Sequence, residues 1–409
     1  MGLGISFESK QRLFSSIKPD DLERVLSQLK VKLGLRGICK QEDGYYITVC
    51  PVGDFRLHFQ KGRLAGEIKT TVAGPGYHKA CVEFIDALGV MLNIKWNVDD
   101  ETGYFFRRYF FEMKSQMLTW LNSMFTHLVI KNKGKNDVQF ICWELGSYLP
   151  ILDNNIISPC GLLVRESIQR LIERNQIEQL ARQFWVWCNE GYDAYFYRGC
   201  ALAMMWCDIP WRKPATNREE AVLLDTLDCL EHASKLDRSI PLPNKEWREL
   251  CELAGKPDLV SQNPPLEFPI QIGYRRNVVR YNFPCDYWIC LPGTFLEEYD
   301  ENATVLHDGD KVFRITVFTV KDQMQQDIKD TMRISFDSFP FGSQQIDVVK
   351  NDYRYLAQFG KTREDDSEYY ILFGQVGGKD KLAMVTISWR DEADEGWAVD
   401  MFQSIQVEQ

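Results

Sequence analysis

The spacing of apolar residues changes once along this chain, near residues 255–269. From about Leu163 to Leu253, apolar side chains recur every three or four residues, as on one face of a helix. From Ile270 onward, they alternate with polar side chains in short runs that are typical of strands. The stretch between the two patterns is rich in proline, which lacks the backbone donor and fixes φ. The pattern therefore predicts a linker over residues 256–269.

The first 158 residues predict an α+β domain. A helix is expected to begin at Pro19 and to end at Gly34, with its apolar positions at helical spacing. Strands separated by turn residues are expected at Tyr45–Cys50, Asp54–Gln60, Arg63–Val72 and, completing the sheet, Val138–Leu145. Helices are expected at Tyr77–Leu92 and about Thr102–His127. The acidic run Asp99–Glu101 precedes the second of these helices, where carboxylates satisfy free amides.

Residues 159–255 predict a helical region, which can pack with the N-terminal domain as one unit. Its helices are expected at Leu163–Arg174, Gln176–Asn189, Ala194–Cys207, Arg218–Leu236 and Lys245–Ala254. Residues 270–409 predict a second α+β domain. Its strands are expected at Val278–Asn282, Tyr287–Leu291, Val312–Val320, Tyr369–Val376, Leu382–Trp389 and Ile405–Val407, with a helix at Glu395–Ser404. The predicted fold class is thus α+β, with antiparallel sheets and a helical middle layer.

Two parts of the helical region resemble one hairpin of a tetratricopeptide array. They are Tyr197–Leu202 and Ala233–Asp237, the latter followed by Pro241. The chain departs from that family through the insertion Asp208–Thr216 between the two helices, and no second copy occurs at that period. Because a tetratricopeptide array needs about three repeats, the resemblance implies a helical layer rather than a solenoid.

Residues 270–409 resemble the PsbP family in the order of their elements. The phrase Tyr281–Pro284 stands before Tyr287-Trp288, the turn Asp308–Asp310 precedes a strand, and Trp397–Ile405 leads to the end. That family includes the oxygen-evolving photosystem protein, a Ran-binding relative and bacterial chaperone-like members. The resemblance implies a curved antiparallel sheet with helices packed on it, used for binding rather than catalysis.

Composition narrows the range of partners. The formal net charge is −10 and no Lys/Arg run stands out, so nucleic acid and anionic membranes are not the expected partners. The 12 cysteines contain no Cys-x-x-Cys pair and lack the dense spacing of a secreted disulfide scaffold. The chain start lacks a secretion signal, and no apolar run approaches the roughly 20 residues of a transmembrane helix. These features predict a cytoplasmic protein.

Catalytic and metal-binding motifs are weak throughout. The five histidines do not lie at ligand spacing from one another or beside a cysteine, so no metal site is predicted. There is no Gly-x-Ser-x-Gly nucleophile elbow. No cofactor is expected, because neither a dinucleotide fingerprint nor a Walker motif occurs.

A glycine-rich turn at residues 73–78 is the most site-like local feature. A strand that runs into Gly74, Gly76 and a helix start can present free amides to an anion, with His78 beside them and Lys79 adding a positive charge. The structural alternative is a tight turn in which the glycines allow unusual φ and close packing. The structural alternative is favoured, since a lone glycine-rich turn is a weak signal.

A second candidate is the loop between two predicted helices that carries Trp206, Trp211 and Arg212. Tryptophan and arginine dominate interface hot spots, and prolines on both sides stiffen the loop. In the alternative interpretation, Trp211 folds back onto the helical layer. The sequence does not decide between these two.

Taken as a sequence, the chain is expected to be a non-enzymatic protein-binding protein whose partner is another protein. A bacterial toxin-immunity or effector-chaperone role is the specific form of this hypothesis, since such proteins act by covering a partner. The alternative is an enzyme, or an anion- or nucleotide-binding protein, with its site around Gly74–His78.

Overall fold

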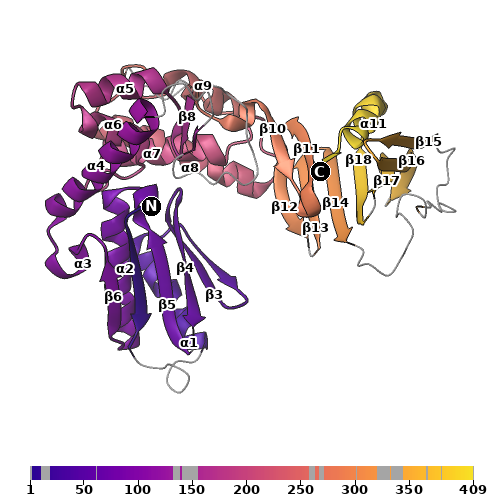
Figure 1. The fold of residues 1–409 in the computed structure, drawn as a ribbon. Coiled ribbons are helices and arrows are strands. Elements are labelled where there is room, and N and C mark those ends of the chain that lie inside the picture. Colours follow the sequence, from indigo (N-terminus) through magenta and orange to yellow (C-terminus); the bar gives the residue numbers. More distant parts are fainter. Residues whose placement is uncertain are drawn as a thin grey trace. The chain divides into compact units, whose positions relative to one another are not determined.

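The computed structural model divides the chain into two compact units (Figure 1). It describes residues 2–10, 19–60, 62–131, 139–140, 155–257, 263–266, 271–300, 302–319, 332, 344–364, 367–378 and 380–408. The first unit is formed by Met1–Glu144, Ile151–Ile209 and Thr216–Gly273; the second includes Pro210–Ala215 and Tyr274–Gln409. Both units combine antiparallel sheets with helices, so the predicted α+β class is confirmed.

A six-stranded antiparallel sheet forms the base of the first unit. Its strands are β1 (Gly4–Ser9), β2 (Gly37–Gln41), β3 (Gly44–Cys50), β4 (Gly53–Gln60), β5 (Arg63–Lys69) and β6 (Trp96–Asp100). Their order in the sheet is β2-β3-β4-β5-β1-β6. The meander β3–β5 was predicted, whereas β1, β2 and β6 were not. Strand β1 lies between β5 and the edge strand β6, and its Ile5 pairs with Ile68 on one side and with Asp100 on the other.

Two helices cover one face of this sheet, as Figure 1 shows. They are α1 (Pro19–Leu33) and α2 (Pro75–Leu92), with the short 3-10 turn η1 (Thr70–Val72) between β5 and α2. Ile47, Leu57, Leu29 and Phe84 are fully buried between the sheet and the helices. Burial of such side chains stabilises the fold by roughly 1.5–3 kcal/mol each.

Most of the remaining elements of the first unit are helices, over residues 104–253. These helices are α3 (Tyr104–Arg107), α4 (Phe110–Thr126), the π-helical turn η2 (His127–Lys131), α5 (Arg165–Glu173), α6 (Ile177–Phe184), α7 (Ala194–Cys207), α8 (Asn217–Leu236) and α9 (Asn244–Leu253). The prediction of one helix from Thr102 to His127 is wrong, because Arg108 has φ of 59° and separates α3 from α4. A left-handed residue cannot continue a right-handed helix.

The predicted strand Val138–Leu145 does not complete the N-terminal sheet within the described residues. Gln139–Phe140 form β7, which pairs in parallel with β8 (Asn155–Ser158). β9 (Gly161–Val164) continues this separate three-stranded sheet. The rest of the predicted strand lies outside the described residues.

The helices α7 and α8 form the hairpin that resembles a tetratricopeptide unit. A small residue such as Gly199 on α7 can allow two helices to approach closely. A Cβ at this glycine would instead lie 2.4 Å from the Val186 carbonyl oxygen, so Gly199 faces the segment between α6 and α7. The close packing that this glycine permits is therefore against residues 185–187.

The predicted linker over residues 256–269 is described only at 256–257 and 263–266. Asn263 is buried and packs on the helical region. Its side-chain amide donates to the carbonyl oxygens of Asp237 (3.1 Å) and Ile240 (3.0 Å), and its Oδ1 accepts from the Ser234 hydroxyl (2.8 Å). Three hydrogen bonds to a buried amide fix this part of the chain on the first unit.

The second unit contains a seven-stranded antiparallel sheet in the order β12-β13-β14-β18-β17-β16-β15. These strands are β12 (Leu296–Asp300), β13 (Ala303–Asp308), β14 (Lys311–Thr319), β15 (Gln344–Lys350), β16 (Tyr353–Glu364), β17 (Ser367–Gly377) and β18 (Lys381–Trp389). A second sheet holds β10 (Val278–Asn282), β11 (Tyr287–Pro292) and β19 (Gln406–Val407). Helix α11 (Glu395–Gln403) packs on the large sheet, where Phe402 occupies the space that a Cβ at Gly374 would need.

Candidate functional site

The glycine turn at the start of α2 is closed by the chain itself. The Gly76 amide donates to the Trp187 carbonyl oxygen (3.0 Å), and the Trp187 amide donates to the Ala73 carbonyl oxygen (2.9 Å). The Trp185 indole also donates to the Thr71 carbonyl oxygen (2.9 Å). The helix start is thus covered by residues 185–187 rather than open to an anion.

The local structure requires glycine at both positions of this turn. Gly74 adopts φ of 105°, which L side chains rarely reach. A Cβ at Gly76 would lie 2.0 Å from Cδ1 of Trp187, so only glycine fits against the indole. The geometry therefore matches the structural interpretation of the turn and does not provide the predicted anion site.

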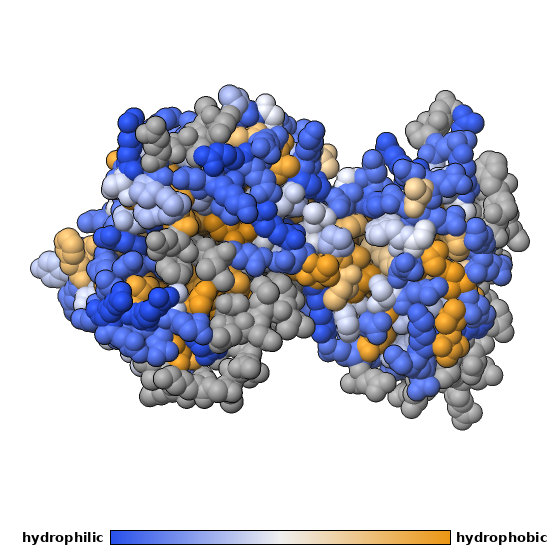
Figure 2. Space-filling view, turned by 90° about the horizontal axis from the view of Figure 1, so that it is seen from above, coloured by the Kyte–Doolittle hydropathy of each residue, from blue (hydrophilic) through white to orange (hydrophobic). Residues whose placement is uncertain are grey.

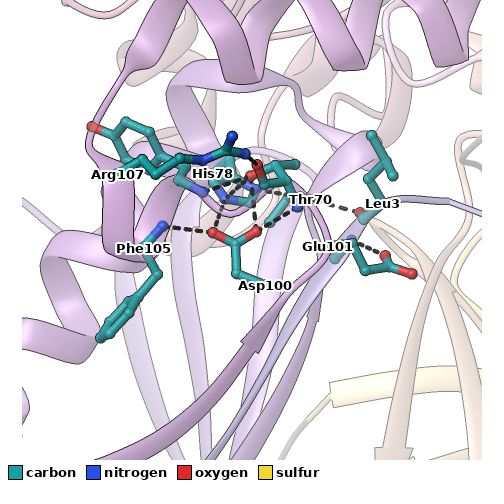
Figure 3. Close-up of polar contacts among 10 residues, drawn as sticks. Leu3, Thr70, His78, Asp100, Glu101, Phe105 and Arg107 are labelled. Carbon is teal, nitrogen blue, oxygen red and sulfur yellow. Dashed lines mark hydrogen bonds and ion pairs between the residues drawn. The ribbon is translucent and has the colours of Figure 1, made fainter.

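His78 belongs to a buried polar cluster at the base of α2 (Figure 3). Its Nδ1 lies 2.9 Å from the Thr70 hydroxyl, and its Nε2 lies 3.4 Å from Oδ2 of Asp100 and 3.2 Å from the Thr102 hydroxyl. The side chains of His78 and Asp100 are 0% exposed. The Thr70 hydroxyl also donates to the Leu3 carbonyl oxygen (3.1 Å), which ties the cluster to the chain before β1.

Asp100 accepts hydrogen bonds from three donors besides His78. Its Oδ1 accepts from the amide and the hydroxyl of Thr102 (both 2.8 Å), and its Oδ2 accepts from the Phe105 amide (2.7 Å). Burial alone would raise the pKa of the Asp100 carboxyl, but the contacts with His78, the Phe105 amide and Thr102 lower that pKa to about 2. The carboxylate therefore holds the start of α3, and its sealed surroundings indicate a structural anchor rather than a catalytic group.

Lys79 lies on α2 next to this cluster and is paired with two carboxylates. Its Nζ lies 3.1 Å from Oε1 of Glu83 and 3.7 Å from Oε1 of Glu190. Partial burial would lower the pKa of Lys79, but the hydrogen bond and attraction from these carboxylates raise it above its usual value. The positive charge of Lys79 is compensated by these two carboxylates, so it does not add to anion binding at the glycine turn.

The predicted loop residues do not form one surface. Trp206 is buried in α7. Arg212 Nε lies 2.7 Å from Oδ1 of Asp308, and the Arg276 guanidinium lies 3.4 Å from the ring centroid of Trp211. Trp211 and Arg212 thus bind residues of the second unit, to which Pro210–Ala215 belong. These contacts hold the loop within the second unit. The loop therefore neither presents both side chains freely to a partner nor folds Trp211 back onto the helical layer.

An exposed aromatic turn is the feature that the sequence interpretation missed. We call residues 104–111 the aromatic turn; it spans α3, Arg108–Tyr109 and the first residues of α4. Phe106, Tyr109 and Phe111 are 71%, 68% and 83% exposed. Figure 2 shows apolar side chains at the edge of the molecule where Figure 1 places α3. Tyr104 and Phe110 of the same turn are buried and anchor it.

Charged and polar contacts fix the backbone of the aromatic turn. Arg107 donates to the Thr102 carbonyl oxygen (2.7 Å) and also pairs with Glu112. The Arg108 guanidinium lies 2.7 Å from Oδ2 of Asp86 on α2 and 4.9 Å from the Phe105 ring centroid. Both arginines are therefore used within the chain to hold the turn.

A signal for this turn exists in the sequence. Residues 104–111 read Tyr-Phe-Phe-Arg-Arg-Tyr-Phe-Phe, with aromatic residues at six of eight positions. A helix at the protein surface buries only one stripe of about 100° or somewhat more. Six aromatic side chains in eight residues cannot all face that stripe, so exposure of some of them could have been predicted.

Two further classes of site find no support among the described residues. Within these ranges, no group of three or more His, Cys, Asp or Glu side chains is placed to hold a metal ion. The helices in the described ranges include none that is both long and apolar enough to cross a bilayer.

Comparison with known proteins gives limited similarity. No protein-family model and no curated protein matches the chain. A crystal structure from Bacteroides thetaiotaomicron VPI-5482 is similar over 32% of this chain and 48% of that chain, with 14% identity and a TM-score of 0.24. The solution structure of cyanobacterial PsbP (CyanoP) from Synechocystis sp. PCC 6803 is similar over 34% of this chain and 96% of that chain, with 14% identity and a TM-score of 0.19.

The chain spans about half the length of the Bacteroides protein. Part of it is thus similar to a PsbP structure. The assignment of the second unit to a PsbP-like fold accordingly stays a proposal.

Proposed function

We propose that this chain is a protein-binding protein and that the aromatic turn is its binding surface. The observation that carries this proposal is the exposure of Phe106, Tyr109 and Phe111 by more than two thirds within six residues. Clustered exposed apolar side chains on soluble proteins mark interaction sites. Aromatic side chains are enriched in interface cores and hot spots.

The rigid support of the turn favours binding. Its backbone is held by Asp100, by the arginine contacts to Thr102 and Asp86, and by two buried aromatic side chains. Side chains on a fixed backbone lose less entropy on association than those on a loop that must order first. The turn is thus suited to present preorganised anchors to a partner.

A toxin-immunity or effector-chaperone role is the specific form of the proposal. Such a role requires covering a partner surface and no chemistry, which fits the net charge of −10 and the absence of a catalytic motif in the sequence. A PsbP-like second unit would add a second binding module. The alternative of an enzyme or a nucleotide-binding protein at Gly74–His78 gains no support, because that turn is closed by residues 185–187.

Partner capture by a variant in which exposed aromatic residues of the aromatic turn are replaced by serine tests this proposal. Phe106→Ser with Phe111→Ser should abolish capture of the partner from lysate of the source organism, without lowering the melting temperature. The matched control is Tyr299→Ser in β12, which removes an aromatic side chain of similar exposure (77%) from the second unit. Undiminished capture by the double variant would refute the aromatic turn as the binding surface.

A further inference from the structure

Strand β6 is an edge of the six-stranded sheet and leaves main-chain groups unpaired. The Glu101 amide donates to the Gly4 carbonyl oxygen of β1 (3.3 Å), and the ladder bonds of an antiparallel pair recur at every second residue. The N–H and C=O groups of Trp96 and Val98 therefore point away from β1. Among the described residues, these groups have no hydrogen-bond partner. An open row of this kind is a template for one further strand.

Strand β6 lacks the lysine, the proline and the bulge that commonly keep edge strands from pairing. Its sequence contains neither lysine nor proline, and its register with β1 has no shift. Asp99 is its exposed charge, since the side chain of Asp100 is turned into the buried cluster. The opposite edge strand of the sheet, β2, carries Lys40. Of these two edges, β6 is therefore the better suited to accept a strand.

The aromatic turn borders this edge. Figure 1 shows α3 beside β6. The Trp96 indole donates to the Ile85 carbonyl oxygen of α2 (2.8 Å), and Arg108 of the aromatic turn is paired with the next residue of α2, Asp86 (2.7 Å). Strand β6 and the aromatic turn thus lie against the same turn of α2, on the helix-covered side of the sheet.

The two faces of a strand added at β6 would meet different surroundings. Val98 is in register with the buried Phe7, and Trp96 contacts α2, so side chains opposite them lie on the helix-covered side, toward the aromatic turn. The alternate side chains lie on the solvent side, opposite Asn97 and Asp99, which are exposed. Apolar residues suit the first face. Lysine or arginine suits the second face, because opposite charges across neighbouring strands are favourable.

We infer that the partner is bound through an extended segment that pairs with β6 as a further strand of the sheet, its alternate apolar side chains against the aromatic turn and a basic side chain opposite Asp99. This inference rests on the proposed function. An extended segment is indicated rather than a helix, because extended backbone matches an open row of N–H and C=O groups. Main-chain pairing supplies affinity, and the aromatic turn selects the side chains. The net charge of −10 favours a basic segment.

Site-specific photo-crosslinking tests the pairing. The probe is benzoylphenylalanine, placed singly at Asn97, Asp99 and Phe106 of the full-length chain and irradiated in cells of the source organism. We expect all three positions to crosslink to one segment of one protein. The residues reached from Asn97 and Asp99 should lie two positions apart in that segment, because side chains of a strand alternate between its faces. The residue reached from Phe106 should lie an odd number of positions from both.

Removal of an outward N–H group gives an independent readout. Val98→Pro removes one such group, and proline is tolerated where the N–H of an edge strand faces solvent. This change should weaken binding of a synthetic peptide with the crosslinked sequence at least tenfold. The matched control is Ile38→Pro in β2, another half-buried β-branched residue. Its N–H also points outward, since the Gln41–Gly44 pair closes the hairpin with β3. Undiminished binding by Val98→Pro would overturn the inference.

Amide hydrogen exchange requires no substitution and tests the same contact if Val98→Pro fails to fold. In the unmodified chain, the amides of Trp96 and Val98 should exchange at least tenfold more slowly once the peptide is bound, because strand pairing gives them acceptors. The amide of Ile38 should exchange at the same rate with and without the peptide. Unchanged exchange at Trp96 and Val98 would overturn the inference.

The remaining outcomes separate the inference from the proposed function. Absence of crosslinks from Asn97 and Asp99 would overturn the pairing with β6, and crosslinks from Phe106 alone would leave the aromatic turn as the binding surface. Crosslinked residues three or four positions apart, as in a helix, or crosslinks to lipid or to a second copy of this chain would also overturn it. Loss of all crosslinks, together with undiminished capture by the Phe106→Ser, Phe111→Ser variant, would refute the proposed function itself.

Discussion

The backbone amide of Phe105 donates to the buried Oδ2 of Asp100 at 2.7 Å. This contact joins the interior of the first unit to its most exposed aromatic segment, because Phe105 immediately precedes Phe106 in the aromatic turn. The same Oδ2 lies 3.4 Å from Nε2 of His78, which is in the first turn of α2. The position of the aromatic turn therefore depends on a carboxylate whose side chain is 0% exposed.

Replacing Asp100 with asparagine should destabilise the first unit. The asparagine side chain would keep one oxygen acceptor, but its NH2 group would face donors that the carboxylate now satisfies. Loss of one buried charged acceptor costs about 1–3 kcal/mol. Chemical denaturation of Asp100→Asn measures this change in the free energy of unfolding.

The control for this change is Asp99→Asn. Asp99 precedes Asp100 in β6, but it is exposed, so its replacement should alter stability by less than about 0.5 kcal/mol. Equal effects of the two substitutions would show that Asp100 is not the anchor of the turn.

The lowered pKa of Asp100 predicts acid sensitivity. The pKa of this carboxyl in the folded protein is about 2, below its ordinary value of 3.8. The folded state therefore binds the proton more weakly than the unfolded chain does, and stability falls as the group is protonated. The contribution is complete above about pH 4 and disappears as the pH falls through about 2. Denaturant midpoints measured from about pH 5 to about pH 2 should drop less steeply for Asp100→Asn than for the unmodified protein.

Local patterns were sufficient to predict much of the secondary structure. The helix at Pro19–Leu33 and the strand at Val278–Asn282 follow directly from apolar spacing and from their turn residues. The strands β1 and β12 were missed, although Ile5 and Phe7 of β1 alternate with polar residues as on a half-buried strand. For β1 the pairing partners are β5 and β6, which no local signal of Gly4–Ser9 indicates.

The candidate site was less accessible to sequence reasoning. His78 was named, but Asp100 was assigned only to a helix start, since the pairing of β6 with β1 that brings it beneath α2 is a long-range contact. Gly76 was named as part of a possible anion site, whereas the packing reason for this glycine is Trp187, more than a hundred residues later. The break at Arg108 was missed because its left-handed backbone is fixed by tertiary contacts, including the ion pair with Asp86.

The closed glycine turn predicts a large effect of a single methyl group. Gly76→Ala would place its Cβ 2.0 Å from Cδ1 of Trp187, so the indole or the helix must shift. Overpacking of this kind costs about 1–3 kcal/mol, which thermal or chemical denaturation resolves. Gly191→Ala is the control, because a Cβ there meets no atom within 4 Å. A destabilised Gly191→Ala and an unaffected Gly76→Ala would contradict this packing.

The same geometry predicts how the turn responds to anions. Because the Gly76 amide is already bonded to the Trp187 carbonyl oxygen, inorganic phosphate should not raise the melting temperature of the protein beyond its general salt effect. Sulfate at equal ionic strength is the control. A phosphate-specific rise that Gly76→Ala removes would restore the anion site and overturn the structural interpretation.

Trp211 and Arg212 should matter for stability rather than for partner binding. Trp211 lies against the Arg276 guanidinium, and Arg212 is paired with Asp308 with both side chains largely buried. Truncation of a fully buried tryptophan costs about 3–5 kcal/mol; Trp211 is only half-buried, so Trp211→Ala should cost about 2–3 kcal/mol. The exposed neighbour Lys213 provides the control, and Lys213→Ala should leave the denaturation midpoint unchanged. If Trp211→Ala left the midpoint unchanged but abolished partner capture, this loop rather than the aromatic turn would be the binding surface.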